Sequence, residues 1–316
     1  MTPDKLELVA VIGNGIIGHG VAQIFAMAGK HVVLIGRSAD SLGRARQKVA
    51  DSLAEFVKHG LIAKDDVAAI VDRITLSQDL KDAAPAQLVI EAVTEDLALK
   101  LDIFGKLDAI CPPPAILASS SGQPASALVA QVKHRERVIA THFWYPPQLI
   151  PLVEVCAGPE TAPDVVNWVC KELRAAGKEP AIIDKEIPGF IGNRLQFAML
   201  REAWALWASG AASAAAIDSV VRYSFGRRVA VTGPLESADV GGLQTMYHFG
   251  RSLLPALDTS PEPAAKIAEL AAAGANGLSN GRGVYDWSKR DGKALIAART
   301  DELFRWLKHD KAAKKS

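Results

Sequence analysis

Residues 6–36, LELVAVIGNGIIGHGVAQIFAMAGKHVVLIG, predict how the first part of the chain folds. The apolar run that ends at Gly13 has the length and composition of a buried parallel strand. A glycine-rich turn follows, then VAQIFAMAG has the apolar spacing of a helix and HVVLIG has the pattern of a second strand. A strand, a glycine-rich turn, a helix and a second strand, all within about 30 residues, are the context that a dinucleotide-binding fingerprint requires.

Three glycines in this turn have the spacing of that fingerprint. Gly13 permits the tight turn, Gly15 lets the backbone approach a pyrophosphate, and Gly18 lets the helix pack closely on the strand. The amino terminus of the helix would face the anion with free N–H groups and the positive end of its dipole. The alternative is an ordinary strand-to-helix turn. The residues expected to contact the dinucleotide are Gly13, Gly15, Ile16, Ile17, Gly18, Arg37, Ser38 and Glu95.

Strand-like and helical segments continue to alternate beyond residue 36. Residues 41–80 have the pattern of two helical segments divided at His59 and Gly60, and residues 95–109 that of a further helix. Further strands are expected at residues 88–93, 115–121, 137–143, 149–155 and 180–185. This alternation predicts a Rossmann-type, doubly wound α/β fold in which a parallel sheet is covered on both faces.

The character of the chain changes after Pro188. The stretch IGNRLQFAMLREAWALWASG predicts one long helix that ends at Gly210, and the residues from there to Lys308 have the pattern of helices and loops. We therefore expect a dinucleotide-binding domain at residues 1–187. An all-helical C-terminal domain, contributing to the substrate cleft and to dimerisation, is expected at residues 188–316.

Composition excludes several classes of function. With 316 residues and a hydrophobic fraction of 49%, the chain can bury a sizeable core. A net charge of +1 gives no bulk attraction to nucleic acid or to a membrane. The three cysteines are scattered, without the spacing of a zinc site or a disulfide framework, so no metal is expected. No signal peptide or membrane span is recognised, and a cytoplasmic location is expected.

A histidine and a glutamate in THFWYPPQLIPLVEV are the candidates for proton transfer. His142 comes just after an apolar strand, at the edge where ligands bind in open α/β sheets. Glu154 lies in an otherwise apolar strand, and a buried carboxylate needs a partner. A carboxylate that holds one imidazole nitrogen leaves the other free to take or give a proton. The alternative is a purely structural histidine.

Two further polar side chains are candidates for binding the reacting oxygen. Ser119, Ser120 and Ser121 end the strand expected at residues 115–121, and one of these hydroxyls could bond an alcohol or a carbonyl oxygen. Asn193 opens the long helix and could orient His142 or the substrate. Helix capping is the alternative for both. A serine hydrolase is disfavoured because no GxSxG elbow surrounds Ser121.

The end of the second strand bears on the choice of dinucleotide. An acidic residue there would accept hydrogen bonds from the 2′-hydroxyl of the adenosine ribose, but this chain has Gly36, Arg37 and Ser38. Without a carboxylate there is no repulsion against a 2′-phosphate, and Arg37 and Ser38 could bind one. The cofactor is therefore NAD or NADP, with a lean toward NADP. The alternative is that Arg37 stacks on adenine while NAD still binds.

Several motifs together resemble the 3-hydroxyacyl-CoA dehydrogenase family, and the resemblance covers nearly the whole chain. The details look closest to the lambda-crystallin / L-gulonate 3-dehydrogenase branch. They also resemble a dehydrogenase that acts on a pyridine-ring alcohol or aldehyde. The stretches that carry the similarity are the fingerprint, SSS (119–121), HFWYPP (142–147), PLVEVCAGPETAP (151–163), GFIGNRLQFAMLREAW (189–204) and GPLE (233–236).

The resemblance implies a role for each candidate. His142 would be the acid/base, Glu154 would orient it, and Ser121 and Asn193 would hold the reacting oxygen. It also implies a homodimer joined through the helical domains. The acyl-CoA enzymes carry Phe-Asn-Pro where this chain has Trp144-Tyr145-Pro146, which puts acyl-CoA specificity in question.

These observations predict an NAD(P)-dependent oxidoreductase that acts on a small molecule. It would interconvert a hydroxyl, beta to a carboxylate or acyl group, and a ketone by hydride transfer, with His142 as acid/base. The first alternative is a dehydrogenase of an aromatic or pyridine-type primary alcohol or aldehyde, where Trp144 and Tyr145 could stack on the ring. The second is a crystallin-like protein that binds the dinucleotide without turnover.

Overall fold

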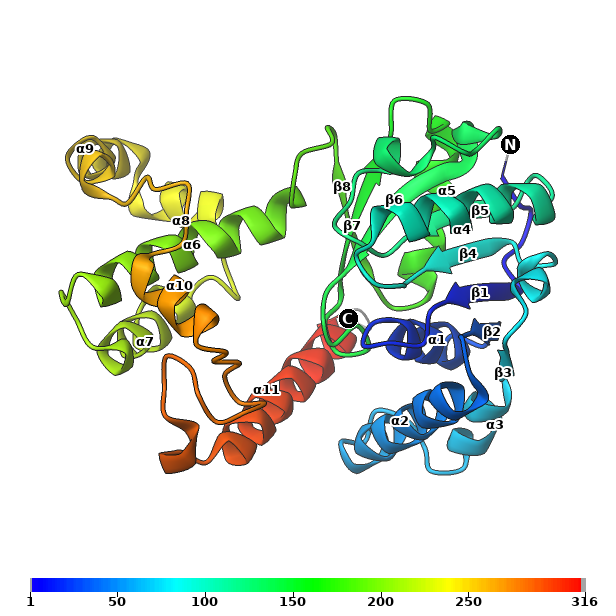
Figure 1. The fold of residues 1–316 in the computed structure, drawn as a ribbon, viewed down its shortest axis with the longest axis horizontal. Helices are drawn as coiled ribbons and strands as arrows, with labels where there is room; N and C mark the ends of the chain where they lie inside the picture. The colour runs from blue at the N-terminus through cyan, green and yellow to red at the C-terminus, as the bar shows by residue number, and fades with distance from the viewer. Residues whose placement is uncertain (1, 314–316) are drawn as a thin grey trace. The chain divides into compact units, whose positions relative to one another are not determined.

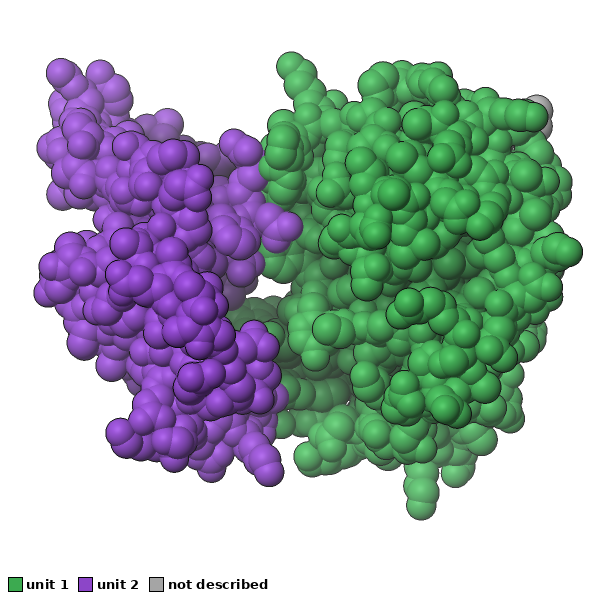
Figure 2. All heavy atoms as spheres, viewed as in Figure 1, with its two compact units in different colours: residues 1–191, 299–316 green, residues 192–298 purple. Residues whose placement is uncertain are grey.

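The computed structural model describes residues 2–313, and the chain divides into two compact units (Figure 2). The first unit comprises residues 1–191 and 299–316, and the second comprises residues 192–298. The last helix, α11 (Gly292–Ala313), thus returns most of its length to the first unit, whereas the sequence placed it with the helical domain. Phe304 of α11 explains this, since its ring is buried at 5.2 Å from the ring of Phe56.

The first unit is built on one eight-stranded sheet (Figure 1). Its strand order is β3-β2-β1-β4-β5-β6-β7-β8. The expected strands are all present, and β3, which the sequence patterns had assigned to a helical excursion, is added at the edge. The strands are β1 (Leu8–Ile12), β2 (His31–Ile35), β3 (Ile74–Ser77), β4 (Leu88–Glu91), β5 (Ile116–Ser119), β6 (Val138–Phe143), β7 (Leu152–Ala157) and β8 (Glu179–Ile183).

The direction of the strands changes at β7. Strands β1 to β6 pair in parallel, as the alternation of strands and helices predicted. Strand β7 returns antiparallel to β6 after a short connection, and β8 runs parallel to β7. A chain that reverses after eight residues without a crossover helix can only pair antiparallel. The sheet is therefore mostly, not wholly, parallel.

Two hydrophobic clusters cover the two faces of this sheet. Side chains alternate along β1, so Val9 and Val11 join one cluster while Ala10 and Ile12 join the other. The first cluster includes side chains from α1 (Gly18–Met27), α2 (Ala39–Lys58), α3 (Asp66–Asp72) and α5 (Pro163–Ala175). The second includes side chains from α4 (Leu97–Ile110). Burial on both faces explains the continuous apolar runs that mark these strands in the sequence.

The second unit is helical, as expected from the Ala-rich periodic segments. Its residues form no strand in the part of the chain that the structure describes, apart from isolated bridges at Arg282. None of the helices within residues 2–313 has the length and apolar character needed to cross a membrane. The helices of this part are α6 (Phe190–Ala208), α7 (Ala214–Tyr223), α8 (Pro234–Gly241), α9 (Leu243–Leu253) and α10 (Ala265–Ala272).

Candidate functional site

The glycine-rich turn between β1 and α1 has the close contacts that its glycines were expected to permit. Gly13 has a φ of 102°, and a Cβ there would lie 2.6 Å from the carbonyl oxygen of Ala92. A Cβ on Gly18 would lie 1.8 Å from the carbonyl oxygen of Gly13. Neither position can take a side chain, so the two glycines fix how α1 leaves the sheet.

Gly15 is different, because a Cβ added to it would meet no atom within 4 Å. The open space in front of it is continuous with a cavity of about 350 Å³ beside the ends of β1, β2 and β4. This is the point where the strand order reverses, which is where dinucleotides bind in such sheets. The turn, the start of α1 and this cavity therefore fit a dinucleotide. Residues that line the cavity include Gly13, Asn14, Gly15, Gly36, Arg37, Val93 and Thr94.

The other expected cofactor contacts lie around this turn. The side chain of Ile16 is exposed, whereas Ile17 packs against the hydrophobic cluster under α1. Glu95 is largely exposed in the segment between β4 and α4, with one carboxylate oxygen 3.7 Å from Lys100 Nζ. These positions are compatible with cofactor contacts, which remain a prediction.

His19, which the sequence did not single out, binds the glycine-rich turn. Its Nδ1 lies 2.6 Å from the carbonyl oxygen of Gly15, so this nitrogen must carry a hydrogen and donate it. Burial lowers the pKa of His19, against the opposing effect of the bond to Gly15. The imidazole is therefore neutral at pH 7 and acts as a donor to the loop.

At the end of β2, the side chain of Asn14 lies close to Gly36. A Cβ added to Gly36 would lie 2.8 Å from Asn14 Oδ1, so the amide of Asn14 occupies the space where a side chain at position 36 would begin. The side chain of Arg37 is exposed beside it at the cavity. Ser38 caps α2 by accepting the N–H of Ser41 at 3.3 Å. The hydroxyl of Ser38 is therefore already used as a helix cap.

The histidine and glutamate singled out in the sequence face each other across two strands. In the antiparallel pairing of β6 with β7, His142 is directly opposite Glu154. Directly opposed residues have their Cβ atoms about 5 Å apart, close enough for side chains to bond. His142 Nδ1 lies 2.8 Å from Glu154 Oε2. Glu154 is 2% exposed, so the pair is a buried carboxylate with a partly accessible imidazole.

Glu154 also binds two donors that the sequence did not reveal. The indole N–H of Trp144 donates to Oε2 at 3.0 Å, and the backbone N–H of Ile191 donates to Oε1 at 3.0 Å. A carboxylate only accepts, so the hydrogen between it and His142 belongs to Nδ1. In the neutral imidazole with its hydrogen on Nδ1, Nε2 carries a lone pair and can accept a proton.

Ser121 belongs to a buried chain of hydroxyl groups. Strands β5 and β6 pair Ser119 with Ala140, so Ser121 and His142 each follow two residues later at the same edge of the sheet. Ser119 Oγ donates to Glu91 Oε2 at 2.7 Å and lies 3.0 Å from Ser121 Oγ. Because the hydrogen of Ser119 is used by Glu91, Ser121 must donate in the second bond.

An ion pair with no access to solvent anchors this chain of hydroxyls. Lys100 Nζ lies 2.8 Å from Glu91 Oε1, and the two side chains are 1% and 0% exposed. The same oxygen accepts the N–H of Val93 at 2.7 Å. A buried ion pair persists only when its remaining hydrogen-bonding capacity is used, which is the case for Glu91.

The start of α6 supplies an aromatic wall as well as the N–H of Ile191. Phe190 is fully buried with a φ of 47°, a backbone region that non-glycine residues seldom adopt. Its ring centroid is 5.8 Å from that of His142. Asn193 follows in the first turn of the same helix and belongs to the second unit. Its expected role toward His142 remains a prediction.

The thiol groups of the chain are buried and have raised pKa values. The three cysteines are free and buried, and burial raises the pKa of Cys111 and of Cys156 to about 11. Thiols of that kind are protonated at neutral pH and poor nucleophiles. No group of three or more potential metal ligands occurs in the described part of the chain.

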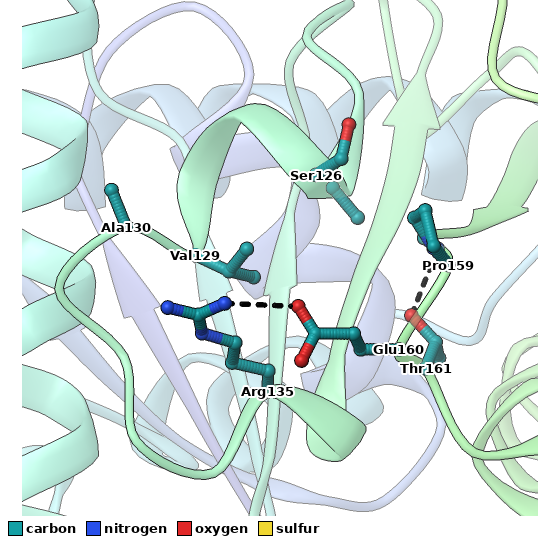
Figure 3. Close-up of a pocket in the computed structure, with 9 residues that line it drawn as sticks. Ser126, Val129, Ala130, Arg135, Pro159, Glu160 and Thr161 are labelled. Carbon is teal, nitrogen blue, oxygen red and sulfur yellow. Dashed lines mark hydrogen bonds and ion pairs between the residues drawn. The ribbon is translucent and has the colours of Figure 1, made fainter.

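A second cavity, of about 230 Å³, lies elsewhere in the first unit (Figure 3). Arg135 and Glu160 point toward each other in it, with 3.1 Å between Nη1 and Oε1. Thr161 Oγ1 accepts the N–H of Gly158 at 2.8 Å. Arg135 is thus paired with Glu160, and none of the predicted site residues lines this cavity.

Comparison with known proteins identifies both halves of the chain. The family model described as the 3-hydroxyacyl-CoA dehydrogenase NAD binding domain matches residues 8–187. The model described as the 3-hydroxyacyl-CoA dehydrogenase C-terminal domain matches residues 189–287.

Individual relatives are similar over almost the full length. The 5-formyl-3-hydroxy-2-methylpyridine 4-carboxylate 5-dehydrogenase of Mesorhizobium japonicum is 33% identical, over 93% of this chain and 95% of the relative. The L-carnitine dehydrogenase of Streptomyces griseus is 35% identical, over 90% and 86%. A crystal structure of the pyridine enzyme, described as an NAD⁺-dependent dismutase, matches with a TM-score of 0.90 at 29% identity, over 97% of this chain and 99% of that one.

Proposed function

Because the chain belongs to the 3-hydroxyacyl-CoA dehydrogenase family, we propose that it interconverts a hydroxyl group and a ketone with His142 as the acid/base. The observation that carries the proposal is the hydrogen bond of His142 Nδ1 to Glu154, which leaves Nε2 as the free acceptor. A bound nicotinamide dinucleotide supplies the hydride acceptor or donor. His142 takes the hydroxyl proton in oxidation and returns it in reduction.

Ser121 and Asn193 are proposed to hold the reacting oxygen. The hydroxyl hydrogen of Ser121 is directed to Ser119 and its oxygen accepts the N–H of Gln123 at 3.3 Å, so in this state Ser121 presents one lone pair to a ligand. To donate to a ketone oxygen, Ser121 must turn its hydrogen away from Ser119. Asn193, whose amide can both donate and accept, would suit either form of the substrate.

The proposed substrate carries its hydroxyl beta to a carboxylate or acyl group, as the family name implies. The similarity to the pyridine-carboxylate enzyme over 93% of this chain favours an aromatic alcohol or aldehyde as a second candidate. In that case Tyr145, which is 57% exposed, could contact the ring. The lambda-crystallin branch indicated by the sequence motifs stays a prediction.

A substrate panel tests this function. Purified protein is titrated with NADH and NADPH by nicotinamide fluorescence, and consumption of the tighter cofactor is followed with 3-oxo acids, 3-oxoacyl thioesters, sugar-acid ketones and aromatic aldehydes. We expect turnover of one ketone class. Turnover of aldehydes alone would favour the second candidate, and tight dinucleotide binding without any turnover would favour a non-catalytic binder.

For the cofactor, NAD is the family's dinucleotide, and we propose that this chain prefers NADP. The absence of a carboxylate at position 36 and the exposed guanidinium of Arg37 support this. We expect the wild-type kcat/KM for NADP to equal or exceed that for NAD. Gly36→Asp combined with Asn14→Ala should shift the ratio toward NAD by more than about tenfold; Asn14→Ala removes one of the two side chains that a Cβ at position 36 would meet, and the other is the end of Leu42, 2.9 Å away.

The control for this prediction is Asn14→Ala alone, which leaves position 36 without a carboxylate. It should change the cofactor ratio much less than the double variant does. A tenfold preference of the wild-type protein for NAD would contradict the proposal and assign Arg37 a different role.

We further propose a homodimer formed through the helical unit. Large apolar side chains stay exposed on α8 and its surroundings, including Val231, Leu235 and Val240 at 76%, 82% and 81% exposed. A monomer rarely leaves such a surface in water. Light scattering should give twice the 33.6 kDa of one chain, and a mass of one chain at micromolar concentration would contradict it. A reducing, cytoplasmic location is proposed from the three free thiols.

A further inference from the structure

Both oxygens of the Glu154 carboxylate accept hydrogen bonds. Oε1 accepts the N–H of Ile191, while Oε2 accepts both His142 Nδ1 and the indole N–H of Trp144. The imidazole and the indole thus share a single oxygen atom. In a buried, weakly polar environment, such charge-assisted bonds are stronger than in water and fix the plane of the carboxylate.

Trp144 reaches this oxygen because it directly follows β6, the strand that carries His142. Residues 142 and 144 are two apart along an extended segment, so their side chains lie on the same side. The ring centroids of His142 and Trp144 are 5.8 Å apart with an interplanar angle of 57°. The indole therefore does not stack on the imidazole but approaches the same carboxylate from another direction.

The segment that carries Trp144 is held from its far side by a buried lysine. Lys178 is 4% exposed, and its Nζ donates to the carbonyl oxygens of Pro147 and Ile150, the latter at 2.8 Å. A charged group that donates to backbone carbonyls limits the freedom of the connection between β6 and β7. Lys178 thus helps to fix the segment from which the indole N–H reaches Glu154, and a site with precise geometry needs such support.

We propose that Trp144 is a positioning residue: its indole N–H holds the Glu154 carboxylate in the orientation that keeps His142 Nδ1 protonated and Nε2 free. This rests on the proposed role of His142 as the acid/base. A phenylalanine at position 144 keeps an aromatic ring but is smaller than the indole and has no donor. The role accordingly depends on one N–H group and not on the aromatic ring as such.

Trp144→Phe tests the proposal in the full-length protein. We expect kcat to fall about tenfold with the best substrate of the panel, because the freed carboxylate holds His142 less well. KM should stay within about twofold, because the indole N–H is directed to Glu154 and not to the substrate. In a Glu154→Gln background, the same substitution should have little further effect, since the charged acceptor that the imidazole and the indole share has already been replaced by a neutral amide.

Nuclear magnetic resonance provides a readout that needs no substrate. The indole N–H signal of Trp144, assigned by its disappearance in Trp144→Phe, should move upfield in Glu154→Gln because a neutral amide is a weaker acceptor. The Nδ1–H signal of His142 should move upfield in Trp144→Phe, since the carboxylate that has lost the indole N–H holds the imidazole less well. Trp168→Phe is the matched control, because that indole donates to the carbonyl oxygen of Pro3 and should leave the His142 signal in place.

Two results would overturn the proposal. If Trp144→Phe keeps kcat and leaves the His142 signal where it is, Trp144 only packs. If KM rises while kcat stays the same, the ring contacts the substrate instead. If no alcohol or ketone is turned over by the wild-type protein, the proposed function fails, but the resonance measurements still decide the role of Trp144.

Discussion

His142→Asn is expected to lower kcat by about a hundred- to ten-thousandfold, which is the usual contribution of a general acid/base. The asparagine cannot take a proton from the substrate hydroxyl, although it can still bond to Glu154. Because the dinucleotide is proposed to bind at the glycine-rich turn and the cavity beside β1, the affinity for NADH should change by less than about twofold. Steady-state kinetics with the best substrate of the panel and a fluorescence titration with NADH give both values.

The matched control for this variant is His134→Asn, which changes a half-exposed histidine outside the site. It should leave both kcat and cofactor affinity as they are in the wild-type protein. Unchanged turnover in His142→Asn would remove this residue as the acid/base. A fall in NADH affinity as large as the fall in kcat would indicate that the substitution damages the fold around β6.

Lys100→Met is expected to destabilise the protein by about 3–5 kcal/mol, because it leaves the buried carboxylate of Glu91 without its counter-ion. A methionine has nearly the same length as the lysine stem, so the loss reflects charge and not volume. The measurement is the midpoint of urea unfolding, compared with that of the wild-type protein. Ser121 should also lose its alignment, since Ser119 joins it to Glu91.

Two further variants separate charge from packing in this prediction. Glu91→Gln combined with Lys100→Met removes both charges and should recover a large part of the lost stability. Lys106→Met breaks the exposed pair with Asp102 on the same helix and should have a much smaller effect. If Lys100→Met and Lys106→Met lower the free energy of unfolding equally, the buried pair contributes no more to stability than the exposed pair.

The elements whose pattern is local were predictable from the sequence. The strand, turn and helix at residues 6–36 carry their own apolar spacing and glycines, and the structure confirms the fold class. Strand β3 was missed because it has only four residues, which are too few to show the alternation of a strand next to a long helical segment. The reversal at β7 was not predicted either, since an apolar strand has the same composition in either direction.

The candidate site was predictable in part. His142 and Glu154 stood out because each is a polar residue in an apolar strand, and such residues require partners. Trp144 was recognised as a departure from the family, but an indole that donates to a carboxylate has the same sequence signature as one that packs. Glu91 and Lys100 gave no signal, because a glutamate at a strand end and a lysine on a helix are ordinarily solvent-exposed.

By itself, the sequence determined most of the element types, the glycine-rich turn and the candidate residues for proton transfer, because these depend on side-chain chemistry and near-neighbour spacing. Only the tertiary structure decided which groups meet. The register of β6 against β7 pairs His142 with Glu154, and a slip by one residue would turn these side chains to opposite faces. The bond from Trp144 and the burial of Lys100 beside Glu91 likewise follow from contacts between separate elements, which local spacing does not encode.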